Sequence, residues 1–92
     1  MISGADTFII NTDKFISSSL GVEIMLMNLE TGDYIGLNVV SADIWKQASS
    51  PKKVEEIIDR LLKEYNVDET VCRAEVQTCI EQMLQKELLL KV

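Results

Sequence analysis

The segment ETGDYIGLNVVSADIW, residues 30–45, contains a turn, a strand and the start of a helix. Gly32 favours a hairpin turn because glycine readily adopts the positive φ angle that tight turns require. Residues 33–37 then predict a strand that runs antiparallel to the preceding apolar run EIMLMNL, residues 23–29. Asn38 suits a helix N-cap, and apolar residues follow it at helical spacing to about residue 49. The segment contains no combination of residues typical of catalysis.

The residues before this segment predict the rest of a small sheet. Phe15–Leu20 is expected to pair with the other side of residues 23–29, which gives a three-stranded antiparallel meander. Residues 33–37 would then form one edge of the sheet. Residues 8–10, Phe-Ile-Ile, fit either an additional short strand or an arm, and the pattern leaves both possibilities open.

Two further helices are expected after residue 49. Ser50 and Pro51 predict the start of the second helix, because proline at the first helical position loses no hydrogen bond. Asn66 suits a left-handed residue at its end, and Asp68 suits the N-cap of a third helix. The apolar stripe of the second helix comprises Val54, Ile57, Ile58, Leu61, Leu62 and Tyr65, and that of the third comprises Cys72, Val76, Cys79, Ile80 and Met83.

The order of elements predicts the fold class. Residues 88–90, three leucines, are expected to end the third helix and to fold back as a strand or an apolar cover. Residues 1–92 then form a single α+β domain, winged-helix-like, in which an N-terminal three-stranded antiparallel sheet is followed by three helices.

The charge and hydropathy of the chain limit its partners. The net charge is −6 and the sequence pI is near 4.5, which is the wrong sign for a surface that binds phosphates. The expected third helix also has more acidic than basic residues, so a DNA-binding winged helix is disfavoured. The chain has no recognisable secretory signal and no apolar run of membrane-spanning length. We therefore expect a cytoplasmic protein with no nucleic-acid or membrane partner.

The sequence also gives no support for catalysis or for a bound metal. It has no histidine, which is the usual general base near neutral pH and the commonest metal ligand. Cys72 and Cys79 would lie on one helix face about 10.5 Å apart along its axis, too far for a disulfide. They also lack the spacing of a redox or zinc pair. We expect two reduced core cysteines, no metal, no cofactor and no enzymatic activity.

The ordered motifs resemble the PqqD-like family over residues 15–92. In that family a strand of the form Tyr-x-Gly-Leu-Asn leads into a helix with Ile-Trp, and the second helix ends at Tyr-x-Val-Asp. The matching residues are Tyr34, Gly36, Leu37, Asn38, Ile44, Trp45, Tyr65, Val67 and Asp68. Three positions depart from the family pattern: Glu75 replaces an aspartate, Cys79 a large apolar residue and Glu87 a glycine.

This resemblance implies a RiPP recognition element, a module that binds the leader segment of a ribosomally synthesised precursor peptide. The leader would add as a strand to the free sheet edge, and its apolar side chains would enter a groove against the third helix. The expected peptide-binding residues are Asp33, Tyr34, Ile35, Gly36, Leu37, Cys72, Glu75, Val76, Cys79 and Met83. Of these, we expect Ile35 and Leu37 to be mostly core, Gly36 to allow close approach of a ligand backbone and Tyr34 to supply a contact surface. The pattern does not show which flank of the third helix faces the edge strand.

The resemblance further implies that a separate enzyme processes the bound peptide. The favoured partner is the cysteine-protease-like subunit that removes the leader in lasso-peptide biosynthesis. The alternative is the radical enzyme of pyrroloquinoline quinone biosynthesis. A structural subunit that binds no peptide is a third possibility.

Overall fold

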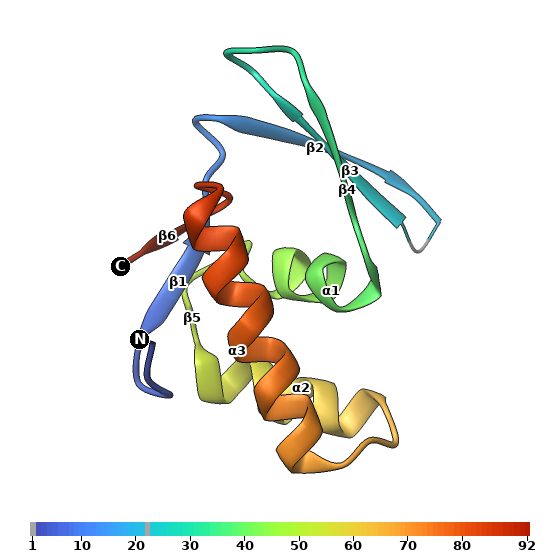
Figure 1. The fold of residues 1–92 in the computed structure, drawn as a ribbon, viewed down its shortest axis with the longest axis vertical. Helices are drawn as coiled ribbons and strands as arrows, with labels where there is room; N and C mark the ends of the chain where they lie inside the picture. Colours follow the sequence, from blue (N-terminus) through green and yellow to red (C-terminus); the bar gives the residue numbers. More distant parts are fainter. Residues whose placement is uncertain (1, 22) are drawn as a thin grey trace.

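The structure of the protein is a computed structural model that describes residues 2–21 and 23–92. Its elements are β1 (Thr7–Ile10), β2 (Phe15–Leu20), β3 (Glu23–Asn28), β4 (Tyr34–Leu37), α1 (Val39–Gln47), β5 (Lys52–Lys53), α2 (Val54–Glu64), α3 (Glu69–Gln85) and β6 (Leu89–Lys91). Figure 1 shows the larger strands projecting above the three helices. Within the described residues, no helix is long and apolar enough to cross a membrane.

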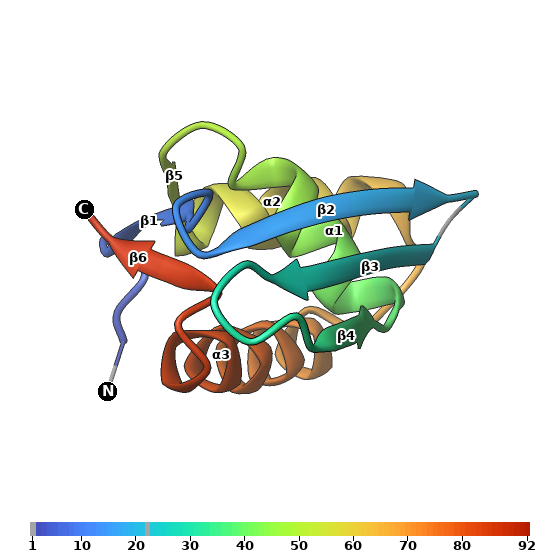
Figure 2. The same cartoon turned by 90° about the horizontal axis from the view of Figure 1, so that it is seen from above.

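The larger sheet has the predicted order, β2-β3-β4, with both pairs antiparallel. Gly32 in the β3–β4 turn has a φ of 78°, as the hairpin prediction required. The last strand begins at Tyr34 rather than Asp33 and lies at an edge of the sheet. The inner face of this sheet packs on α1, with α1 and α2 behind the strands in Figure 2.

A second sheet, of order β5-β1-β6, brings the two ends of the chain together. Residues 8–10 therefore belong to a strand, which decides between the two possibilities that the sequence left open. The chain after α3 does fold back as a strand, and Phe8 pairs with Lys91. This second sheet was not predicted, because β5 is only two lysines long and depends on pairing with distant residues.

The predicted start of the second helix at Ser50–Pro51 is wrong. Helix α2 begins at Val54, because Lys52 and Lys53 are held in extended conformation against β1. The N–H of Lys53 donates to Glu56 Oε1 at 3.0 Å, which satisfies one of the groups at the helix start. The predicted N-caps of the other two helices are confirmed: Asn38 accepts from the Ser41 N–H and Asp68 accepts from the Thr70 N–H.

One hydrophobic core joins the sheets and the helices. Its largest fully buried side chains come from β1, β3, all three helices and the chain after α3. They are Phe8, Ile24, Leu26, Ile44, Ile57, Ile58, Ile80, Leu88, Leu89, Val54 and Val76. The predicted apolar faces of the second and third helices are thus mainly buried, although Tyr65 is 41% exposed.

The turn after α3 contains the one non-glycine residue with positive φ in the described part of the chain, Glu87 at 62°. The prediction that Asn66 ends α2 in this conformation is wrong, because the helix ends in an extended Tyr65. At the end of α3 the N–H of Glu87 donates to Leu84 O and the N–H of Leu88 donates to Met83 O. This pair of bonds is a Schellman motif, which usually places glycine at the left-handed position.

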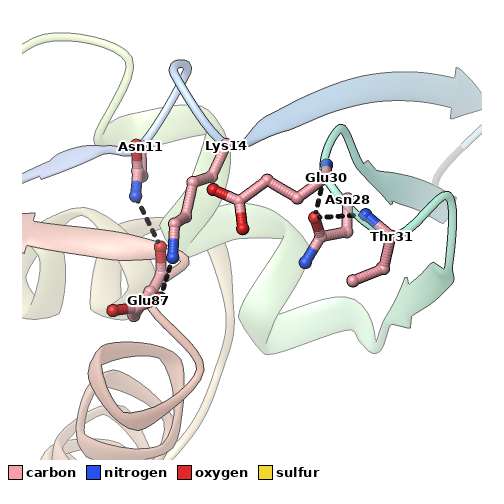
Figure 3. A network of polar contacts seen from close by, with 6 residues as sticks. All are labelled: Asn11, Lys14, Asn28, Glu30, Thr31 and Glu87. Carbon is pink, nitrogen blue, oxygen red and sulfur yellow. Dashed lines mark hydrogen bonds and ion pairs between the residues drawn. The ribbon is translucent and has the colours of Figure 1, made fainter.

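Side chains from the β1–β2 connection hold this turn in place. Asn11 Nδ2 donates to Glu87 O at 2.9 Å, and Lys14 is paired with the Glu87 carboxylate (Figure 3). The hydrogen bond to that carboxylate raises the pKa of Lys14. Glu87 therefore combines an unfavourable backbone conformation with contacts that fix the turn against the rest of the protein.

We expect Glu87→Gly to be more stable than Glu87→Ala by roughly 1 kcal/mol, because only glycine adopts positive φ without steric strain. Both variants lose the exposed ion pair with Lys14, so that ion pair does not contribute to their difference. Urea denaturation would measure it. An alanine variant as stable as the glycine variant would contradict the assignment of strain to Glu87.

Candidate functional site

A groove runs between the edge strand β4 and the C-terminal half of α3. We call it the β4–α3 groove; its volume is about 170 Å³. It is lined by Ile35, Gly36, Leu37, Asn38, Ser41, Cys79, Gln82, Met83, Lys86 and Leu88. Asn38 caps α1 directly after β4, and Ser41 Oγ in the first turn of α1 lies 3.8 Å from Cys79 Sγ. The β4–α1 junction and α3 thus form the walls of the groove.

The backbone of β4 is hydrogen-bonded on one side only within the described sheet. The Asn28 N–H donates to Asp33 O at 2.8 Å, so these two residues form a hydrogen-bonded pair at the start of the β3–β4 ladder. Such pairs alternate along an antiparallel ladder. With the observed register, Tyr34 and Gly36 therefore direct their N–H and C=O groups away from β3, toward the free edge.

The side chains of β4 alternate between the two faces of the sheet. Ile35 and Leu37 lie opposite the buried Leu26 and Ile24 and pack on the core, as the alternation predicted. Tyr34 points to the other face and is 68% exposed. A Cβ atom on Gly36 would lie 3.4 Å from Met25 Sδ, which is an ordinary van der Waals distance, so the sheet itself has room for a small side chain at this position.

The structure shows which flank of α3 faces β4. Gln82, Lys86 and the expected residues Cys79 and Met83 line the β4–α3 groove. Gln82 and Lys86 were not predicted, although their spacing of three and seven residues from Cys79 places them on the same helix face. The opposite flank turns to α2, where Arg73 Nη1 lies 2.6 Å from Glu55 Oε1.

The remaining expected residues of α3 lie further along the helix. Glu75 and Cys79 line a shallow hollow that shares Asn38 and Cys79 with the β4–α3 groove. Cys72, Glu75 and Val76 line an apolar cavity of about 160 Å³ between the three helices. The other residues of this cavity are Val39, Val40, Leu61, Tyr65, Val67 and Val71. Eight of the ten expected residues therefore follow one continuous track from the groove to the cavity, whereas Asp33 and Tyr34 line neither.

The polar groups around this track suit binding better than acid–base chemistry. Burial raises the pKa of the Cys72 thiol. The Tyr65 hydroxyl donates to Asp43 Oδ2 at 2.7 Å, and this bond raises its pKa. Among the residues that the structure describes, no group of three or more His, Cys, Asp or Glu side chains could hold a metal ion. The track offers free backbone groups, apolar side chains and few charges, which are the requirements for an extended peptide.

Comparison with known proteins gives two matches. Residues 23–89 match the family model described as "Coenzyme PQQ synthesis protein D (PqqD)". A solved structure described as "TbiB1 in Complex with the TbiA(beta) Leader Peptide" is 33% identical in sequence, with a TM-score of 0.78, and the match covers 88% of this chain and 93% of that chain. A search of curated proteins gives no match. The structural match confirms the predicted α+β fold class.

We expect N-ethylmaleimide to label Cys79 faster than Cys72 near neutral pH. Cys79 is partly exposed in the groove, whereas Cys72 is 6% exposed and has a raised pKa, which lowers its reactive thiolate fraction. Raising the pH should speed the labelling of Cys72. Mass spectrometry of the digested protein measures both rates, with Cys79→Ser as the control, and equal rates at neutral pH would contradict the structure.

Proposed function

The chain belongs to the PqqD family, as its sequence resemblance predicted, and we propose that it binds the leader segment of a ribosomally synthesised precursor peptide. The observation that carries this proposal is the free edge of β4 beside the β4–α3 groove. The structurally similar TbiB1 supports it, since that protein was solved with a leader peptide. The role is then that of an adaptor rather than a catalyst.

In the proposed complex the leader adds to the larger sheet as a fourth strand. The outward backbone groups of Tyr34 and Gly36 hydrogen-bond to the peptide, which gives affinity without regard to sequence. Every second peptide side chain then turns toward α3, because side chains alternate along a strand. These side chains enter the groove beside Cys79 and Met83 and give specificity.

The ten expected residues take different roles in this arrangement. Ile35 and Leu37 hold β4 in place, and Met83 and Val76 lie on the groove and cavity floors, with 3% and 1% of their surface exposed. Cys72, Glu75 and Val76 would contact any part of the peptide that extends past β4 into the apolar cavity. Asp33 precedes the strand and contributes charge at its start.

The protein would deliver the bound peptide to a separate enzyme and so raise the local concentration of the peptide at that enzyme. We favour the cysteine-protease-like subunit that removes the leader in lasso-peptide biosynthesis, on the likeness of the ETGDYIGLN hairpin. The radical enzyme of pyrroloquinoline quinone biosynthesis is the second candidate, and the description of the matched family favours it. In both cases this chain binds and presents the peptide.

We expect Gly36→Pro to weaken leader binding at least tenfold, about 1.4 kcal/mol, because proline removes an outward N–H that would bond to the peptide. Gly36→Ala keeps that N–H and is the matched control. Calorimetric titration with the leader of the precursor peptide encoded beside this chain measures the affinity, and circular dichroism checks that the helices are folded. Unchanged affinity in a folded proline variant would refute strand addition at β4.

We expect Cys79→Lys to weaken leader binding, because it places a charge where apolar peptide side chains are proposed to lie. Gln85→Lys introduces the same charge on the exposed surface of α3, away from the groove, and should bind the leader as the parent does. The same titration compares them. Equal affinities in two folded variants would place the peptide elsewhere on the protein.

A further inference from the structure

An apolar row crosses the outer face of the larger sheet, the face turned away from the helices. Ile16, Met27 and Tyr34 lie directly opposite one another on β2, β3 and β4. Ile16 is 56% exposed and Tyr34 is 68% exposed. In Figure 2 this face is turned toward the viewer, and α1 and α2 lie behind it. The row therefore does not contribute to the core that joins the sheet to the helices.

Two methionines form the middle of this face. Met25 and Met27 are partly buried, yet neither is among the side chains that pack against the core. Met25 lies opposite Gly36 on β4, and a Cβ atom on Gly36 would lie 3.4 Å from Met25 Sδ, so the methionine covers the sheet next to the edge strand. Methionine is flexible and polarisable, and such side chains adapt to the surface of a partner.

The charges around this face define the kind of partner that would fit. The three strands and the turns between them, residues 15–37, contain Glu23, Glu30 and Asp33 but neither lysine nor arginine, and Lys14 just before β2 is paired with Glu87. Exposed edge strands usually carry lysine or proline, which discourages association, and this segment has neither. A second copy of the chain would bring the same negative charges together and is disfavoured. A protein with an apolar centre and a basic rim is complementary.

This face is also continuous with the peptide site. A peptide strand on the edge of β4 would direct its outward side chains to positions beside Tyr34 and Gly36, because side chains on neighbouring strands stand in register. The apolar row would then extend onto the peptide. The loaded protein would present a larger apolar surface than the free protein, and that surface would include part of the ligand.

We propose that the outer face of the β2-β3-β4 sheet is the docking surface for the enzyme that processes the bound peptide. This inference rests on the proposed function. Because the docked surface includes the peptide, the enzyme binds the loaded protein more tightly than the free protein. By thermodynamic linkage, the enzyme raises the affinity for the peptide by the same factor.

Ile16→Glu tests this proposal, because Ile16 lies on β2, at the edge opposite the peptide site. The probe is the purified peptide-processing enzyme encoded in the same gene cluster, titrated against the protein with and without leader peptide. We expect tighter binding with the leader present, and a loss of roughly tenfold or more in enzyme affinity for the variant. Val92→Glu makes the same change at an apolar residue that is 70% exposed elsewhere, and should not alter binding.

Leader affinity is measured separately for each variant and should match the parent value. A parent protein that does not bind the leader would refute the proposed function itself. Normal leader binding together with an enzyme that does not bind, or that binds Ile16→Glu as well as the parent, would overturn the docking proposal alone. A parent dimer in sedimentation that Ile16→Glu dissociates would assign the face to a second copy instead. If Ile16→Glu does not fold, Ser18→Glu on the same exposed face replaces it.

Discussion

The pairing of β4 with β3 is the interaction on which the rest of the candidate site depends. Ile35 and Leu37 pack on the core through one face of the strand, and the backbone bonds to β3 use one of its edges. Among the residues that the structure describes, the other edge has no paired strand and lies beside α3. A free edge on a mobile loop would lose conformational entropy on binding, whereas an edge held by a core needs little ordering.

Much of the fold follows from local sequence patterns, because hairpins, caps and amphipathic helices are determined by neighbouring residues. Gly32, Asn38 and Asp68 acted as predicted. The second sheet and the true start of α2 were missed, because β1 holds Lys52 and Lys53 as a strand across a long stretch of sequence. Pro51 favours a helix start locally, but the pairing of β5 with β1 outweighs that preference.

The sequence predicts that the candidate site lies between a strand and a helix, but it does not predict which residues of the helix line the groove. Helical spacing places Glu75 and Lys86 on one flank, yet the rotation of α3 depends on contacts with α2 and on the turn at Glu87. These contacts join segments that are distant in the sequence, so no local sequence pattern predicts them. The resemblance to a family pointed to peptide binding, and the structure distributes eight of the ten expected residues between a groove at β4 and a cavity between the helices.

The small sheet formed by the two ends of the chain has a consequence for how such a module can be built into larger proteins. β6 pairs with β1 and the Val92 N–H donates to Thr7 O, so the first and last strands are neighbours in Figures 1 and 2. A further domain joined before β1 or after β6 would be attached next to the same small sheet. The domain is therefore suited to fusion at either terminus, with β4 and its groove left open on another side.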